Sequence, residues 1–332
     1  MKSGQLLDLI KREEDKIVDF RHKTRSLSGS VRREVVTLDR DADLQTFWPS
    51  DPAPVLFRGQ TAIYEPCVST IVRGLPLDWR DYAARDVTQF ILSHIRSAWF
   101  VEHLRHHPFG RWAMDQSIGI NTVAVAQHYG LDTHYIDVTE SPSVAAFFAT
   151  CRIVKGNNPG EVVCTPIDHG TGIFYRVRWH NLPFRSCRPI GLQPFPRPRE
   201  QSAWTYELWH GEDFQNPRCE QSPCVESVLF EHSLSLSQHF LRIFDNGSAL
   251  FPADVMAEVA DMIRTSSFVP ADIARLVIDA MSNDPDWRSK LPAVPAFEDI
   301  LRDQFRCDLK EGVLLLFTEE QKKRIADADS QM

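Results

Sequence analysis

The stretch from His134 to Ala149 constrains the fold more than any other part of the chain. His134-Tyr135-Ile136-Asp137 has the pattern of a short strand. Ser141 is a favourable N-cap and Pro142 a favourable first helical residue, so we expect a helix to begin there. Its residues from Val144 to Ala149 are apolar or small and should be buried. A strand that leads directly into a buried helix indicates a β core interrupted by helices.

The rest of the chain supports this fold class. A strand at Val55-Leu56-Phe57 should deliver Arg58 at its end. Further strands are expected at 161–166, 172–179, 203–208 and 225–230, and helices at 81–104, 121–129 and 235–244. The prediction is an α+β fold with a mixed, largely antiparallel β core, inserted helices, and helical segments at both ends of the chain. Five prolines between residues 183 and 198 predict a long irregular surface loop over the sheet.

The pattern divides the 332-residue chain into three parts. Residues 1–50 are expected to form an amphipathic helix, over Gln5 to Lys23, and a linker that includes Ser26 to Val31. Residues 54–264 form the main domain. Residues 265–332 form a helical extension, which needs a partner surface because apolar residues recur at helical spacing between Ile273 and Met281.

Charge and cysteine content narrow the function classes. The net charge of -8 argues against coating of nucleic acid, although a local basic cleft remains possible. The start of the chain lacks the apolar stretch of a signal peptide, and the longest apolar runs are too short to span a bilayer. Seven irregularly spaced cysteines without a C-x-x-C pair make disulfides and structural zinc unexpected. We therefore expect a cytoplasmic protein with no metal and no membrane partner; the oligomeric state is left open.

The first of three polar clusters is Phe57-Arg58-Gly59-Gln60. A glycine directly after an arginine lets the backbone approach a ligand closely. The guanidinium is a planar fork that suits phosphate or carboxylate. The alternative is a surface arginine in a turn.

The second cluster runs through Gln127-His128-Tyr129-Gly130 and continues at Asp137 to Pro142. A histidine at a helix end is suited to ligand contact or acid–base work, or is a structural histidine. Thr139 and Ser141 are either caps or part of an anion site, because helix N-termini favour anions.

The third cluster is Arg197-Pro198-Arg199-Glu200-Gln201-Ser202-Ala203-Trp204, where the proline-rich stretch meets a strand. Two arginines beside two polar acceptors suit a nucleotide pocket. The alternative is a solvated loop.

Taken in order, these segments resemble the FRG domain family, which is named for its Phe/Tyr-Arg-Gly motif. The likeness is carried by Leu56 to Gln60, Pro66 to Ser69, Val125 to Leu131 and Ile136 to Ala149, and more loosely by Arg199, Gln201 and Leu250-Phe251-Pro252. It covers roughly residues 54–264. Two segments depart from the family's pattern. Where the family has Thr-Arg-Leu-Leu-Asp-Trp-Thr, this chain has His134 in place of the arginine and Val138 in place of the tryptophan. Gln201-Ser202-Ala203 replaces a double glutamine and glycine.

The chain also has a distant likeness to ADP-ribosyltransferases. In these enzymes an early arginine grips the phosphate of NAD, a Ser/Thr turn lies by the nicotinamide ribose, and a late glutamate stabilises the charge that develops as nicotinamide leaves. Arg58, Thr139 with Ser141, and Glu200 with Gln201 fall in the same order.

This likeness implies roles for named residues. Glu200, Gln201 and His128 would be catalytic. The NAD-binding residues would be Arg58, Gly59, Gln60, Gln127, Tyr129, Thr139, Ser141 and Arg199. A glutamine at the glutamate position would keep a hydrogen bond and lose the charge, which costs about 2.7–4 kcal/mol of barrier.

Three functions follow. The first is an ADP-ribosyltransferase-like enzyme that takes NAD as substrate, cleaves its nicotinamide–ribose bond, and either hydrolyses NAD or modifies an unidentified macromolecular acceptor, protein or nucleic acid. The second is a non-catalytic nucleotide-binding or sensor module. The third is a metal-dependent hydrolase or nuclease that uses His128, His134 and Asp137.

Overall fold

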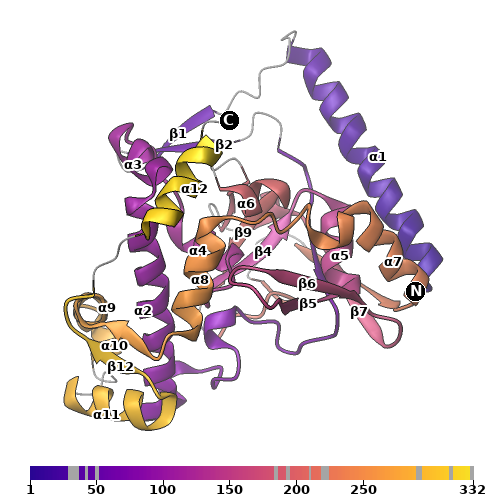
Figure 1. The fold of residues 1–332 in the computed structure, drawn as a ribbon. Coiled ribbons are helices and arrows are strands. Elements are labelled where there is room, and N and C mark those ends of the chain that lie inside the picture. The colour runs from indigo at the N-terminus through magenta and orange to yellow at the C-terminus, as the bar shows by residue number, and fades with distance from the viewer. Residues whose placement is uncertain are drawn as a thin grey trace.

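The computed structural model confirms the α+β class (Figure 1). It describes residues 1–28, 37–41, 44–48, 52–182, 186–191, 195–208, 211–217, 224–288, 294–313 and 317–329. A central sheet lies between a group of N-terminal and central helices on one side and a larger helical layer on the other (Figure 1).

The central sheet has six strands in the order β10-β7-β3-β4-β9-β8, and every neighbouring pair is antiparallel. The strands are β3 (Leu56–Gln60), β4 (Tyr135–Thr139), β7 (Thr171–Val177), β8 (Cys187–Pro189), β9 (Ala203–Glu207) and β10 (Val225–Glu231). β3 continues through Gln60, so Arg58 lies inside a strand and not at its end as predicted. The sequence did not predict β8, which has only three residues.

Three two-stranded sheets lie outside the central one. They are the antiparallel pairs β1 (Thr37–Asp41) with β2 (Leu44–Trp48) and β5 (Cys151–Lys155) with β6 (Val162–Pro166), and the parallel pair β11 (Phe268–Pro270) with β12 (Asp308–Lys310). Of these, the sequence predicted β6 and a short strand from Val35 to Thr37. β1 begins at Thr37, and Val35 and Val36 lie outside the described residues.

Helices α1 (Ser3–Ser28), α5 (Pro142–Thr150) and α7 (Leu234–Ile243) cover one face of the sheet. α5 begins as predicted: the Ser141 hydroxyl accepts a hydrogen bond from the Val144 amide at 3.2 Å. Its Phe147 is fully buried in a cluster with Phe57 and Phe174 from the strands below. The predicted link from Ser26 to Val31 is helical as far as Ser28, and its remaining residues lie outside the described part of the chain.

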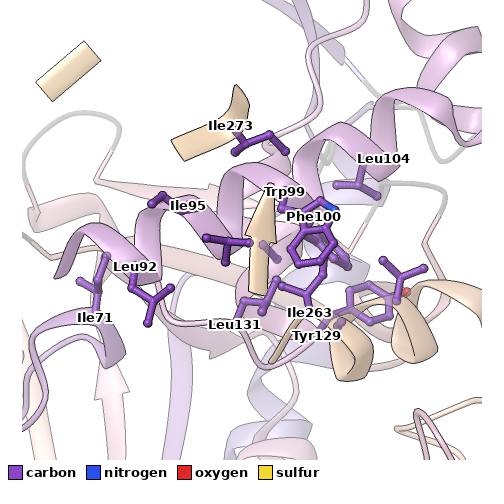
Figure 2. Packing of buried hydrophobic residues seen from close by; sticks show 14 of the residues in the cluster. Ile71, Leu92, Ile95, Trp99, Phe100, Leu104, Tyr129, Leu131, Ile263 and Ile273 are labelled. Atoms are coloured by element: carbon purple, nitrogen blue, oxygen red, sulfur yellow. The ribbon is translucent and has the colours of Figure 1, made fainter. Parts of the chain in front are cut away.

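A second core joins the main domain to the end of the chain. α2 (Ala84–His106) packs against α4 (Thr122–His128), α8 (Val255–Thr265), α9 (Ala271–Ser282) and α11 (Val294–Phe305), and α12 (Glu319–Asp329) packs on α8. Figure 2 shows Phe100 of α2 beside Tyr129, and their ring centres are 5.5 Å apart. One buried cluster extends from Ile71 to Ile325. Ile273, Val277 and Met281 thus have the partner surface that the sequence required, whereas Leu276 is exposed. The division at residue 264 stays a prediction.

The prediction of an irregular proline-rich loop is wrong for part of that stretch. β8 and the short helix α6 (Pro196–Glu200) lie within it, and Arg197 of α6 is buried. Pro196 occupies the first turn of α6, where its missing N–H costs nothing. Pro183 and Pro194 lie outside the described residues.

The remaining elements are short. They are α3 (Pro108–Asp115), α10 (Pro285–Arg288) and the 3-10 turns η1 (Thr70–Val72), η2 (Trp79–Asp81), η3 (Trp179–Asn181) and η4 (Asp245–Gly247). Within the described ranges, no helix has the length and apolar character needed to cross a membrane.

The cysteines differ from the expectation at one position. Cys224 is disulfide-bonded, so the expectation of no disulfide is wrong there. Cys67, Cys151, Cys164, Cys187 and Cys307 are free thiols.

His107, at the junction of α2 and α3, makes stability depend on pH. Its Nδ1 accepts a hydrogen bond from the Phe109 amide at 3.3 Å, and burial lowers its pKa from 6.5 to about 4. The unfolded chain therefore takes up the proton first, and stability is lost as pH falls from 6.5 towards 4. The loss from this group should be about 3 kcal/mol.

His107→Asn keeps a capping acceptor and does not titrate, so it should lose less stability on acidification than the unmodified protein. Urea unfolding at pH 7 and pH 4.5 measures this. His22→Asn, at an exposed position of α1, is the control and should behave as wild type. If the two variants lost the same stability between pH 7 and pH 4.5, His107 would not be the group responsible for the loss.

Candidate functional site

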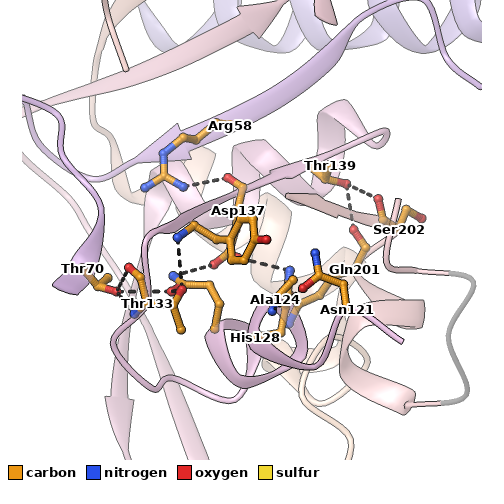
Figure 3. Close-up of polar contacts among 12 residues, drawn as sticks. Arg58, Thr70, Asn121, Ala124, His128, Thr133, Asp137, Thr139, Gln201 and Ser202 are labelled. Carbon is orange, nitrogen blue, oxygen red and sulfur yellow. Dashed lines mark hydrogen bonds and ion pairs between the residues drawn. The ribbon is translucent and has the colours of Figure 1, made fainter. Parts of the chain in front are cut away.

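A polar pocket of about 170 Å³ lies between β3, β4, α5 and the residue that follows α6. Its polar side chains belong to Arg58, His128, Asp137, Thr139 and Gln201 (Figure 3). Its other described lining residues are Phe57, Gly59, Val138, Val144, Ala145, Phe148 and Ala203. The structure thus brings residues from all three polar clusters of the sequence into one cavity.

The pocket exists because the middle of the sheet is split. β3 pairs with β7 over five residues but with β4 only at Phe57 and Thr139. Beyond that pair the two strands separate, and the Arg58 side chain bridges the gap by donating from Nη1 to the Asp137 carbonyl oxygen at 2.7 Å. Among the described residues no carboxylate forms an ion pair with Arg58, so its positive charge remains available to an anion.

Gln201 fixes the orientation of His128. The Gln201 side chain is 4% exposed, and its Nε2 donates to the Leu250 carbonyl at 3.0 Å. Because a carbonyl only accepts, the amide oxygen of Gln201 must face His128 Nδ1, which lies 2.9 Å away. His128 Nδ1 therefore carries a proton. A glutamate could not donate to Leu250, which explains why the neutral glutamine fits this position.

The other ring nitrogen of His128 faces a carboxylate. Nε2 lies 3.1 Å from Asp137 Oδ1, and the two atoms are not aligned as a hydrogen bond. Neither has another hydrogen-bond partner among the described residues. An unprotonated Nε2 and an ionised carboxylate would both be acceptors and would repel at this distance. A proton taken up at Nε2 would turn this repulsion into attraction, so the pair is suited to accept a proton.

Gln127 supports Asp137 from behind. Its Nε2 lies 3.5 Å from Asp137 Oδ2, at the limit of a hydrogen bond, and its Oε1 accepts from Thr133 at 2.7 Å and from Thr70 at 3.2 Å. Both hydroxyls donate to the same oxygen, which orients the amide nitrogen towards the carboxylate. Gln127 therefore positions Asp137 and does not itself line the pocket.

Gly59 lines the pocket, but α5 is the reason that a glycine stands there. A Cβ at this position would overlap the Ala145 carbonyl oxygen and lie 2.7 Å from the Ala149 amide nitrogen. The sequence predicted that a ligand would approach the backbone at Gly59 closely, but in the structure it is α5 that does so.

Two hydroxyls predicted to contact the ligand are used within the protein. Thr139 donates to the Gln201 carbonyl at 2.7 Å and accepts from the Ser141 amide at 3.0 Å. Ser141 caps α5 and does not line the pocket. These two residues tie β4, α5 and Gln201 together.

The other predicted residues lie away from the pocket. Glu200 and Arg199 are exposed and pair with each other at 3.2 Å. Tyr129 is buried and donates to Asp254 at 3.0 Å, and burial followed by the Asp254 carboxylate raises the pKa of its hydroxyl. Gln60 accepts from Tyr175 at 3.0 Å. None of the four lines the pocket.

Asp137 is the pocket residue that the predicted set of site residues lacked. The sequence placed it at the end of a strand, beside the motif, and assigned it only to the metal hypothesis. Its position directly before Val138-Thr139 in a strand that ends at a helix cap was the available signal.

The three residues of the metal hypothesis do not meet. His134 Nε2 lies 3.5 Å from Glu207, and His134 does not line the pocket that holds His128 and Asp137. Among the described residues, no three His, Cys, Asp or Glu side chains are grouped so that they could hold a metal ion.

Comparison with known proteins found a match to a family model over part of the chain. The model of the FRG domain matches residues 53–158, a range that includes Arg58, His128 and Asp137 but ends before Gln201. Searches of curated proteins and of solved structures found no match. The matched segment, about a third of the chain, is similar to the FRG domain, and it supplies most of the lining residues of the polar pocket.

Proposed function

We propose that the pocket binds NAD at its nicotinamide–ribose end and cleaves the bond between them, in the manner of an ADP-ribosyltransferase. The observation that carries this proposal is the convergence of a guanidinium, a histidine and a carboxylate in one partly apolar pocket, with Arg58 lacking a carboxylate partner among the described residues. A pocket of about 170 Å³ suits one ring-sized group. Most of the dinucleotide would therefore lie across its mouth, since sites that enclose whole drug-sized ligands measure about 300–1,000 Å³.

The carboxylate and the histidine each have a step in this reaction. The glycosidic bond breaks, nicotinamide leaves with the electron pair, and positive charge develops on the ribose. The Asp137 carboxylate would stabilise that charge, which a fixed anion in a partly dry pocket does effectively. Water or an acceptor hydroxyl then attacks the ribose carbon, and the His128–Asp137 pair takes the proton that it releases. In this scheme Asp137 performs the task for which the sequence offered Glu200 or Gln201.

The acceptor can be water or a macromolecule, protein or nucleic acid, and the experiment distinguishes them. NAD labelled in the nicotinamide ring reports cleavage, and NAD labelled in the adenylate part reports where ADP-ribose goes. Release of nicotinamide with free ADP-ribose indicates hydrolysis, whereas label in a macromolecule indicates transfer. NAD binding without release of nicotinamide would instead support a nucleotide-binding module.

Arg58→Ala should weaken NAD binding roughly 10- to 100-fold, because a charge-assisted hydrogen bond contributes about 1.5–3 kcal/mol. Calorimetry with NAD measures this, and circular dichroism checks that the variant folds. Arg199→Ala is the matched control, because Arg199 is exposed and pairs with Glu200 outside the pocket. Equal affinity for NAD in the two variants would contradict the proposal that Arg58 binds NAD.

A further inference from the structure

Arg197 is a buried charge that contacts three distant parts of the chain. It lies in the first turn of α6 and is 5% exposed. Its Nη2 donates to the carbonyl oxygen of Gly160, between β5 and β6, at 2.7 Å. Its guanidinium lies 5.2 Å from the centre of the Tyr129 ring and 5.6 Å from the centre of the Phe251 ring. Keeping a charge in such a place is costly, so its contacts need to offset that cost.

Two of its contacts bear on Gln201, the residue that orients His128. The Gln201 amide donates to the Arg197 carbonyl at 3.2 Å, so the turn that holds Arg197 also holds the Gln201 backbone. Gln201 Nε2 donates to the Leu250 carbonyl, and Phe251, which follows Leu250, packs against the guanidinium. Arg197 therefore fixes both the backbone of Gln201 and the segment that turns its side chain.

The contact with Tyr129 bears on His128 itself. Tyr129 follows His128 at the end of α4, and its hydroxyl donates to Asp254 at 3.0 Å. The guanidinium at its ring and the carboxylate at its hydroxyl hold Tyr129 at two points. A planar guanidinium packs on aromatic rings in a way that a lysine ammonium does not. Arg197 thus helps to keep the His128 ring where its Nδ1 lies 2.9 Å from the Gln201 amide oxygen.

We propose that Arg197 is a positioning residue: by holding Gln201 and Tyr129, it keeps the neutral ring of His128 in the form that carries its proton on Nδ1. The hydrogen bond that one ring nitrogen makes decides which nitrogen of a histidine is protonated. Without the Gln201 acceptor, the proton would move to Nε2, which faces Asp137 Oδ1 at 3.1 Å. Nε2 could then no longer accept a proton from a nucleophile. This consequence for NAD cleavage rests on the proposed function, whereas the effect of Arg197 on the His128 ring does not.

NMR of the ¹⁵N-labelled histidine rings, in protein without NAD and at a pH where the ring is neutral, distinguishes the two forms. The signals of His128 are identified among the twelve histidines by their absence in His128→Asn. The unmodified protein should show the Nδ1–H form. Arg197→Met keeps a long apolar side chain and removes the charge and the donor, so it should shift His128 towards the Nε2–H form. Arg199→Met is the matched control on the same helix, at an exposed position, and should keep the Nδ1–H form.

Three more variants separate positioning from a general loss of stability. Phe297→Leu, in the core around α11, should lower the melting temperature and leave the His128 ring unchanged. Arg197→Lys keeps the charge but not the flat guanidinium, so it should shift His128 in the same direction as Arg197→Met. Gln201→Leu should produce the full shift by itself. Adding Arg197→Met to Gln201→Leu should change nothing further, because both act through one contact.

NAD cleavage is measured separately, so that a failure of either proposal is recognised. Arg197→Met should lower the rate of nicotinamide release at saturating NAD by up to about 10²-fold, the effect of a misplaced reacting group, with little change in NAD affinity. A protein that cleaves no NAD would contradict the proposed function and leave the NMR result standing. The role of Arg197 is overturned if Arg197→Met or Arg197→Lys keeps the Nδ1–H form, or if Arg199→Met or Phe297→Leu loses it. It is also overturned if Arg197→Met still shifts the ring in the Gln201→Leu background.

Discussion

Replacing Asp137 by asparagine is expected to lower the rate of nicotinamide release from NAD by roughly 10²- to 10³-fold, the effect of losing one group that stabilises the transition state electrostatically. Asparagine keeps the size and polarity of the side chain and removes its negative charge. The asparagine oxygen can still accept from Gln127, so the local geometry should survive. NAD binding should change little, because the charge that Asp137 opposes develops fully only as nicotinamide leaves.

Single-turnover measurement of nicotinamide release at saturating NAD checks this expectation, since it separates chemistry from binding. Glu200→Gln is the matched control: it also removes one carboxylate charge, but from an exposed residue outside the pocket. It should retain wild-type rates. A large loss of rate in Glu200→Gln with a small loss of rate in Asp137→Asn would assign the catalytic role to Glu200 and contradict the role proposed for Asp137.

Gly59→Ala is expected to destabilise the folded protein by about 3 kcal/mol or more, at the upper end of what overpacking costs. The added methyl group would overlap the backbone of α5 at Ala145 and Ala149. A backbone cannot rotate away as a flexible side chain does. The strand and the helix would therefore have to move apart, which opens the cluster that contains Phe57 and Phe147.

Thermal unfolding followed by circular dichroism measures this effect, with a fall in melting temperature of roughly 4 °C or more expected. Gly4→Ala, in α1, is the matched control, because a Cβ there meets nothing within 4 Å. It should not destabilise the protein, since alanine favours a helix more than glycine does. An unchanged melting temperature in Gly59→Ala would show that α5 does not approach β3 as closely as the structure has it.

Local signals in the sequence were sufficient for much of the fold. Ser141 and Pro142 specify the start of α5 through a cap and a fixed backbone angle, both of which depend only on neighbouring residues. The apolar spacing of α2 and the glycine that follows α4 are also signals that depend only on neighbouring residues. Gly130 adopts a positive φ of 82°. β8 and α6 were not predicted because prolines hide both patterns and because three strand residues carry almost no periodicity.

The polar pocket was predictable only in part. Arg58 and His128 were named because they belong to recognisable motifs. The choice between Glu200 and Gln201 depends on the direction in which the end of α6 points, and successive residues on a helix point about 100° apart. The sequence cannot give that rotation, because it follows from the packing of Arg197 and Gln201 against distant residues such as Gly160 and Leu250.

The sequence by itself determined the fold class, the cap and burial of α5, and the motifs that carry the FRG domain. The tertiary structure decided which polar groups face one another: it split the sheet between β3 and β4, turned Gln201 towards His128 and left Glu200 outside. The physical reason is the range of the interactions. Caps and periodicity act over a few residues, whereas the partners of His128 lie 9 and 73 positions away and meet only when the sheet and its helices are assembled.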